Sequence, residues 1–109
     1  MKDVNARLLS SELTLQLIGY VNTITHAQRR PFEDSISLVG MGSSRIFSID
    51  LLPLSSLDTL ALIYLLNIAL ACKQNDIRIN IFVDESNERH THIYKLLLSI
   101  TPDIYIEFN

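Results

Sequence analysis

The segment from Leu60 to Cys72 restricts the fold more than any other part of the sequence, because it is apolar except for Asn67. It is 13 residues long, whereas a helix that crosses a bilayer needs about 20 apolar residues. The segment therefore predicts a buried helix in a globular domain rather than a membrane span. Asp58, just before it, is a favourable N-cap residue, so we expect this helix over residues 58–74.

Alternation of apolar and polar residues indicates the strands. In residues 13–21, Leu13, Leu15 and Leu17 alternate with polar neighbours, as in a strand with one buried face. The segment Val4–Leu9 comes before it, and the short polar connection predicts a hairpin. Further strands are expected at residues 45–51, 77–83 and 104–108. The face of the sheet away from the helices should be more exposed to solvent and should carry Thr14, Gln16, Arg78, Asn80 and Glu107.

Two more helices are expected, one on each side of the apolar helix in the sequence. The first should begin near Pro31, because proline is favoured in a first helical turn, and should end at Gly40-Met41-Gly42. The other should be capped by Ser86 and stopped by Thr101-Pro102. Its apolar stripe at helical spacing consists of Ile93, Leu96, Leu97 and Ile100.

The expected order of elements is β-β-α-β-α-β-α-β. Strand, helix and strand over residues 45–83 provide enough chain for a parallel crossover. Because the strands alternate instead of being wholly apolar, we expect helices on one face of a mixed sheet, in an α/β sandwich. A length of 109 residues, with 48% hydrophobic residues, fits one domain over residues 1–109.

Composition and charge exclude several classes of protein. The net charge of −3 leaves no basic excess to neutralise phosphates, so we expect no nucleic-acid partner. The single cysteine, Cys72, cannot form an internal disulfide and fits a reducing compartment; its place in an apolar helix predicts a buried structural thiol. The polar first residues do not resemble a signal peptide. We therefore expect a cytoplasmic protein with no direct membrane span.

Histidines and glycines give little support for catalysis. The segment at residues 40–44 has no lysine of a phosphate-binding loop and precedes a strand, so a helix end with a turn is the better interpretation. His90 and His92 are two residues apart on a helix, and their side chains point about 200° apart. They therefore cannot share a metal ion, and we expect both to be solvated.

Asp50, Asp58 and Asp84 fall near strand ends or helix starts, where ligands often bind in α/β sheets. Helix capping and strand termination are the preferred roles for these carboxylates. The alternative is a small enzyme or ligand-binding site built from the three of them. We expect neither a metal nor a cofactor.

Only one side of the helix at residues 58–74 can face the sheet. Helical spacing places Leu62, Leu65, Leu66 and Ala69 on the sheet-facing side. It places Leu60, Ile63, Tyr64, Asn67, Ala71 and Gln74 on the other side. The second side is mostly apolar, so either a neighbouring helix or another protein must cover it. The excess of large apolar residues favours a partner bound through Leu60, Ile63, Tyr64 and Asn67.

Thr59 would be the first residue of this helix, directly after its cap Asp58. A phosphate on its hydroxyl would be stabilised by the helix dipole and would add about two negative charges beside the apolar side. Thr59 is therefore a candidate phosphorylation site. The simpler interpretation is that Asp58 caps a buried helix and that Thr59 has no role of its own.

These features resemble the STAS family, which has the fold of anti-sigma factor antagonists and of sulfate-transporter tails. Its hallmark is a strand that ends in Asp, a short polar loop, and Asp-Ser or Asp-Thr at the start of a long helix. The corresponding segments here are residues 47–51, residues 54–57 and Asp58-Thr59. Gly19 and Lys73-Gln74-Asn75 also fit the pattern, and the resemblance covers residues 4–108.

Within the family, the Asp58-Thr59 pair, the leucine-rich helix and Pro31 are similar to MlaB-type proteins, the small STAS subunits of Mla phospholipid-transport ABC complexes. This resemblance implies a non-enzymatic accessory subunit that binds the ATPase subunit at the cytoplasmic side of the inner membrane. It also implies that Asp58, Thr59 and the adjoining apolar side of the helix take part in that contact.

The resemblance also implies an alternative, an anti-sigma factor antagonist regulated by phosphorylation of Thr59 and bound by an anti-sigma factor kinase. The sequence departs from the antagonist motif at two positions. Leu60 replaces its second Ser, and Ala61 stands where Gly is frequent, which hinders close approach of another backbone. Both departures weaken a kinase-recognised site without affecting a hydrophobic docking helix.

Overall fold

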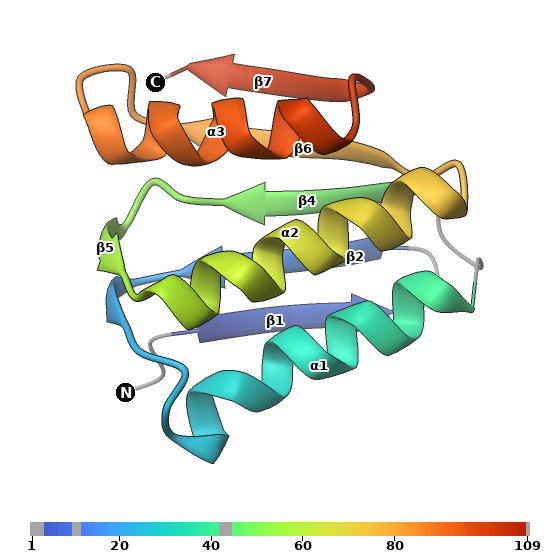
Figure 1. The fold of residues 1–109 in the computed structure, drawn as a ribbon, viewed down its shortest axis with the longest axis horizontal. Coiled ribbons are helices and arrows are strands. Elements are labelled where there is room, and N and C mark those ends of the chain that lie inside the picture. The colour runs from blue at the N-terminus through green and yellow to red at the C-terminus, as the bar shows by residue number, and fades with distance from the viewer. Residues whose placement is uncertain (1–3, 10–11, 42–44, 109) are drawn as a thin grey trace.

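The computed structural model describes residues 4–9, 12–41 and 45–108, which form a sheet covered by one layer of helices (Figure 1). Its strands are β1 (Val4–Leu9), β2 (Glu12–Leu17), β3 (Gly19–Val21), β4 (Ile46–Asp50), β5 (Leu54–Leu57), β6 (Arg78–Val83) and β7 (Ile104–Phe108). Its helices are α1 (His26–Gly40), α2 (Thr59–Gln74) and α3 (Glu88–Ile100). Ser10, Ser11 and residues 42–44, where two of the turns were expected, lie outside the described residues.

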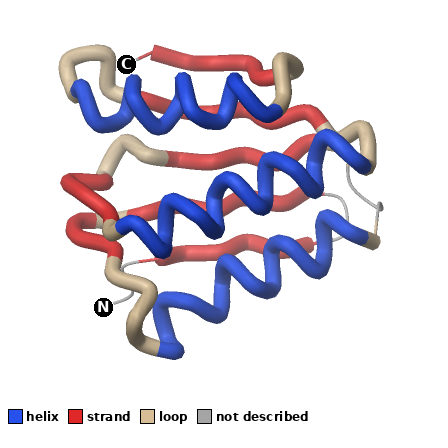
Figure 2. Tube along the Cα trace, viewed as in Figure 1, coloured by secondary structure: helices blue, strands red, loops and turns tan. Residues whose placement is uncertain are grey.

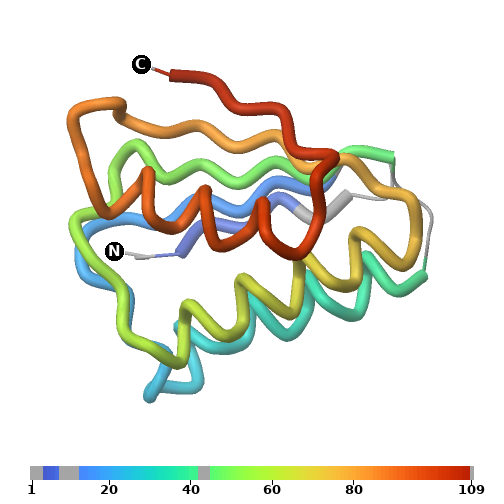
Figure 3. Tube along the Cα trace, turned by 45° about the horizontal axis from the view of Figure 1, so that its top comes forward, coloured from blue at the N-terminus to red at the C-terminus, as the bar shows by residue number. Residues whose placement is uncertain are grey.

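The main sheet has the strand order β1-β2-β4-β6-β7. The β1–β2 pair is antiparallel, and the three following pairs are parallel. Parallel neighbours need crossover connections, and α1, α2 and α3 each lie in one of them. All three helices cover the same face of the sheet (Figure 3). The expected mixed sheet with helices on one face is thus confirmed.

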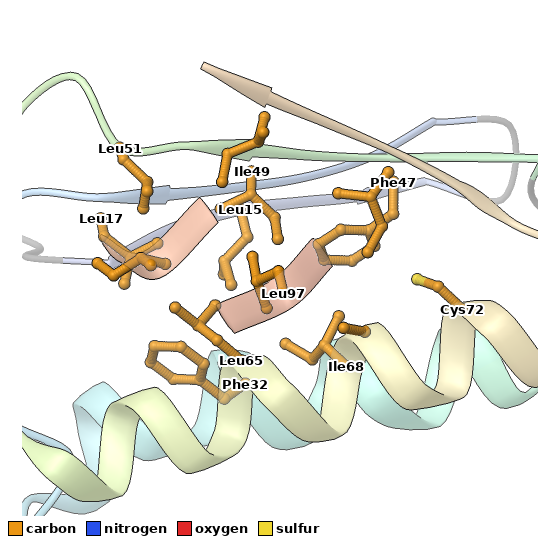
Figure 4. Packing of buried hydrophobic residues seen from close by; sticks show 14 of the residues in the cluster. Leu15, Leu17, Phe32, Phe47, Ile49, Leu51, Leu65, Ile68, Cys72 and Leu97 are labelled. Carbon is orange, nitrogen blue, oxygen red and sulfur yellow. The ribbon is translucent and has the colours of Figure 1, made fainter. Parts of the chain in front are cut away.

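The core lies between the sheet and this helical layer (Figure 4). Leu13, Leu15 and Leu17 of β2 are buried, whereas Thr14 and Gln16 between them are half-buried. The strands β4 and β6 repeat this alternation. Their buried residues are Phe47, Ile49, Ile79, Ile81 and Val83. Period-two patterning in the sequence therefore determines which side of each strand meets the helices.

The other face of the sheet carries polar side chains, together with the exposed Ile46 and Tyr105. The side-chain amide of Asn5 donates to Gln16 Oε1 at 3.1 Å, and Gln16 Nε2 donates to Asp50 Oδ2 at 2.7 Å. These bonds form a ladder across β1, β2 and β4. Arg78 and Glu107 are exposed on β6 and β7, in agreement with the predicted wetter face.

A second, two-stranded sheet differs from the sequence prediction. The expected strand over residues 13–21 ends at Leu17, and Gly19 then adopts a positive φ of 65°, a conformation that glycine enters at little cost. The chain after this break forms β3, which pairs in parallel with β5. Residues 54–57 correspond to the short polar loop of the family pattern, but here they form β5, whose partner strand is remote in sequence.

The starts of two helices also differ from the prediction. α1 begins at His26 with Thr25 as its N-cap, so Pro31 lies inside the helix. An interior proline removes one backbone donor and crowds the carbonyl one turn earlier, yet α1 is helical on both sides of Pro31. α3 is capped by Asn87, whose Oδ1 accepts from the N–H groups of Arg89 and His90. Ser86 instead donates from its hydroxyl to Asp84.

α2 begins after Asp58 and ends at Gln74, as the sequence predicts, and lies between α1 and α3 (Figure 2). Of the four residues expected to face the sheet, Leu65 and Ala69 are buried and Leu62 and Leu66 are half-buried. The remaining buried positions of α2 are Ala61, Ile68 and Cys72. The buried side is therefore rotated toward Ala61, Ile68 and Cys72, and α2 packs against a helix on each flank as well as against the sheet.

Candidate interaction surface

The chain turns into α2 at Asp58, and several hydrogen bonds hold this residue in place. Its Oδ1 accepts from the backbone N–H of Ala61 at 2.7 Å, which confirms Asp58 as the N-cap. The hydroxyl of Thr23 donates to the same oxygen at 3.4 Å. The N–H of Asp58 donates to the carbonyl of Val21 in β3 at 3.0 Å. We call Asp58 and Thr59 the α2 corner, and its position is tied to β3 as well as to the helix.

Thr59 is exposed, and it lines a groove of about 700 Å³ between the N-terminal ends of α2 and α3. The groove is lined by Ser56, Leu57, Asp58, Thr59, Leu62, Glu88, Arg89, His92 and Ile93. Its α3 wall carries charge of both signs, from Glu88 and Arg89. The α2 corner therefore borders a concave surface with both polar and apolar lining residues, and Thr59 is exposed at its edge.

A line of exposed residues runs along α2 from this corner. Leu60 is 39% exposed, Ile63 46% and Leu70 44%, and Asn67 is exposed between the last two. Residues three and four apart are neighbours on a helix surface, so these four side chains form one continuous row. We call this row the α2 stripe. Leu70 extends the row by about one turn beyond Asn67, the last residue expected at the partner surface.

Tyr64 is placed differently from the expectation. Its ring packs against Phe32 of α1, with 5.8 Å between ring centroids and a tilt of 30°, and the side chain is half-buried. Ala71, expected on the same open side, is also half-buried. Helical spacing divides α2 into two sides, but α2 has three neighbours, and α1 covers the part that holds Tyr64.

His90 is the largest correction among the candidate residues. It was expected to be solvated, but it is 1% exposed. Its Nδ1 accepts from the backbone N–H of Asp84 at 3.0 Å, and its Nε2 contacts the carbonyl of Leu54 at 2.8 Å. His92 is exposed, as expected, and lines the groove. The two rings have separate environments.

Arg89 was missed by the sequence analysis. Its Nη1 donates to the carbonyl of Ser55 at 3.2 Å, beside the contact between His90 and Leu54. These contacts join residues 34 and 36 positions apart in sequence, and no local pattern indicates them. The nearest signal is Asn87, because the helix that it caps has these two residues in its first turn.

The three aspartates have separate local roles. Asp50 accepts from the N–H of Leu52 at 3.0 Å, in addition to the Gln16 bond in the polar ladder. Asp84 accepts from the hydroxyl of Ser86 at 2.7 Å and from its N–H at 2.9 Å, and these two bonds lower the pKa of Asp84. Among the described residues, no group of three or more His, Cys, Asp or Glu side chains is arranged to hold a metal ion.

Cys72 is fully buried, as expected, and its burial raises the pKa of the thiol to about 12. The thiolate is the reactive form of cysteine, so this thiol is unsuited to nucleophilic attack. Within the described residues, no helix combines the length and apolar character needed to cross a membrane.

No protein-family model and no curated protein matches the sequence. Among solved structures, the chain is similar to the anti-sigma factor antagonist SpoIIAA in its unphosphorylated form, with a TM-score of 0.72 over 95% of this chain and 86% of that chain. The two sequences are 10% identical, so the similarity is one of fold. The chain therefore has the STAS fold that the sequence resemblance predicts.

Proposed function

We propose that the protein is a non-enzymatic STAS-domain subunit that binds a protein partner through the α2 corner and the α2 stripe. The observation that carries this proposal is the stripe itself, because α1 and α3 cover the flanks of α2 and leave Leu60, Ile63 and Leu70 exposed. Contiguous apolar surface of this kind is typical of protein–protein contacts. Asn67 and Thr59 add polar groups at its centre and edge.

The partner that we favour is the ATPase subunit of an Mla-type phospholipid ABC transporter. The Asp58-Thr59 pair and the leucine-rich helix that follows support this choice, through their similarity to MlaB-type subunits. Such a role places the protein in the cytoplasm, at the inner face of the inner membrane. Its contribution would be to support assembly and activity of the ATPase, with no chemistry of its own.

Co-purification of the tagged protein with the ATPase subunit tests this function, with matched variants of two isoleucines. Ile63→Lys places a charge in the α2 stripe, where burial against a partner is costly. Ile46→Lys is the control, because Ile46 is 45% exposed, close to the 46% of Ile63, but lies on β4. We expect the ATPase to be lost from Ile63→Lys and kept by Ile46→Lys. Equal recovery from both variants would reject the docking surface.

The fold similarity to an anti-sigma factor antagonist favours a second candidate function. In it, an anti-sigma factor kinase binds the α2 corner and phosphorylates Thr59, and the added charge beside Leu60 and Ile63 breaks the complex. Incubation with the candidate kinases and ATP, followed by intact mass measurement, should show one added phosphate. Thr59→Ala should prevent the addition, and Ser56→Ala, in the same groove, should not. An unmodified mass with every candidate kinase excludes this role.

A further inference from the structure

Two adjacent residues at the start of α3 bond to two adjacent carbonyls of β5. His90 Nε2 lies 2.8 Å from the Leu54 oxygen, and Arg89 Nη1 lies 3.2 Å from the Ser55 oxygen. β5 leads directly into Asp58, so these bonds hold the strand that places the α2 corner. Among the described residues, the strand that pairs with β5 is the three-residue β3.

The bonds of His90 fix its protonation state. A backbone N–H can only donate, so Nδ1, which faces the N–H of Asp84, must be the unprotonated acceptor. A carbonyl can only accept, so Nε2 must carry the proton and donate to Leu54. An imidazolium ring would direct an Nδ1–H at the N–H of Asp84. The arrangement therefore requires the neutral Nε2–H tautomer.

We propose that His90 and Arg89 are positioning residues for the α2 corner. The buried ring joins three segments: the loop after β6 through Asp84, the helix α3, and β5 through Leu54. Loss of the Nε2 bond would leave the Leu54 carbonyl without that partner at a buried site, at a cost larger than the net value of an ordinary hydrogen bond. β5 would then loosen, and with it the placement of Asp58 against Val21 and Ala61.

This inference rests on the proposed function only in that the α2 corner is the surface to be positioned. It concerns the order of the free protein, so its test needs no partner. A negative result would remove the role of His90 while leaving the docking surface intact. Conversely, failure of the co-purification test would leave the link between α3 and β5 unaffected.

Amide hydrogen exchange of two substitutions of His90 tests the proposal. Asn can place an amide oxygen where Nδ1 lies, which keeps only the bond from Asp84; Gln can place an amide nitrogen where Nε2 lies, which keeps only the bond to Leu54. We expect His90→Asn to raise the exchange rates of the Asp58 and Ala61 amides about tenfold relative to those of β6. We expect the His90→Gln variant to keep these exchange rates close to those of the unmodified protein. His92→Gln is the control, because that ring is exposed.

Equal effects of Asn and Gln, or a uniform rise that includes the β6 amides, would overturn the proposal, because both results indicate a general packing role. Arg89→Gln should raise the same corner amides by a smaller factor, since its bond to Ser55 is exposed. A readout without substitution is available from ¹⁵N NMR of the unmodified protein. It should show His90 as the Nε2–H tautomer, and an Nδ1–H signal would also overturn the proposal.

Discussion

The main sheet and the small β3–β5 sheet share one hydrophobic core, but the small sheet depends more on directional hydrogen bonds. The central strands of the main sheet are buried on one face by alternating large apolar side chains, and the helical layer covers them (Figure 4). The β3–β5 pair has three and four residues, with a register shift between Gly19 and Tyr20. Val21 and Leu54 are buried in the core, and directional bonds to Val21, Leu54 and Ser55 add to this burial.

This difference separates stability from placement. Burial of apolar area is non-directional and provides most of the folding free energy, so the main sheet should lose stability with each core side chain removed. Hydrogen bonds contribute less net free energy but fix geometry. Substitutions near the α2 corner should therefore change local order more than global stability. The candidate site lies where directional bonds act in addition to apolar burial.

The largest expected effect is in the core between α2 and the sheet. Leu65→Ala removes a fully buried side chain and should lower the free energy of unfolding by about 2–5 kcal/mol. Leu70→Ala, on the same helix but 44% exposed, should change it by less than about 0.5 kcal/mol. Urea denaturation measures both. Similar losses for the two variants would mean that Leu70 is covered and that the α2 stripe is shorter.

The next effect is at the α2 corner. Asp58→Ala removes the cap of α2 and should cost about 0.5–2 kcal/mol in denaturant unfolding, with a larger local effect on exchange of the Ala61 amide. The comparison is Asp34→Ala, which removes an exposed carboxylate paired with Arg30 at 3.8 Å on α1. That exposed pair contributes little. If Asp34→Ala destabilises the protein as much as Asp58→Ala, the hydrogen bonds of the α2 corner contribute no more stability than an exposed ion pair.

The smallest effect concerns the loop that faces His90. The Ser86 bonds lower the pKa of Asp84 in the folded protein. A carboxyl group with a lowered folded-state pKa adds stability above its unfolded-state pKa, about 3.9, and loses it as the pH falls through the folded-state value. Ser86→Ala should raise the pKa of Asp84 toward its ordinary value. The stability difference from the parent should be present at neutral pH and shrink below about pH 4.

An NMR titration of the Asp84 carboxyl checks the pKa. Unfolding measured at neutral pH and below about pH 4 checks the stability difference. Ser99→Ala removes a hydroxyl that donates to the Leu96 carbonyl, and it should leave the Asp84 titration unchanged. A stability difference for Ser86→Ala that persists without change into acid would show that it has another cause.

The sequence predicted the main sheet and α2 because their signals are local and repeated. Leu13, Leu15 and Leu17 give the period of a strand within five residues, and the segment from Leu60 to Cys72 displays helical length and a cap at Asp58. Each signal is confirmed by burial of the expected strand face or by the bounds of α2. Local patterning is therefore sufficient to predict an element when the residues at its repeated apolar positions all pack against the opposing layer of the fold.

The parts that sequence reasoning missed depend on contacts between remote residues. β5 is a strand only because β3 lies beside it, and His90 is buried only because α3 begins above β5. Tyr64 is covered only because α1 places Phe32 against it. None of these neighbours can be identified from spacing along the chain. The candidate surface was therefore predicted along α2 itself but not at its borders with α1 and α3.

The most direct test of the docking surface is site-specific photo-crosslinking in cells that contain the transporter. A photoreactive benzoylphenylalanine replaces Ile63 in the α2 stripe or, as the matched control, Ile46 on β4. We predict a crosslink from position 63 to the ABC ATPase subunit and none from position 46. Absence of the ATPase crosslink at position 63, or equal crosslinks from both positions, would contradict the proposed function.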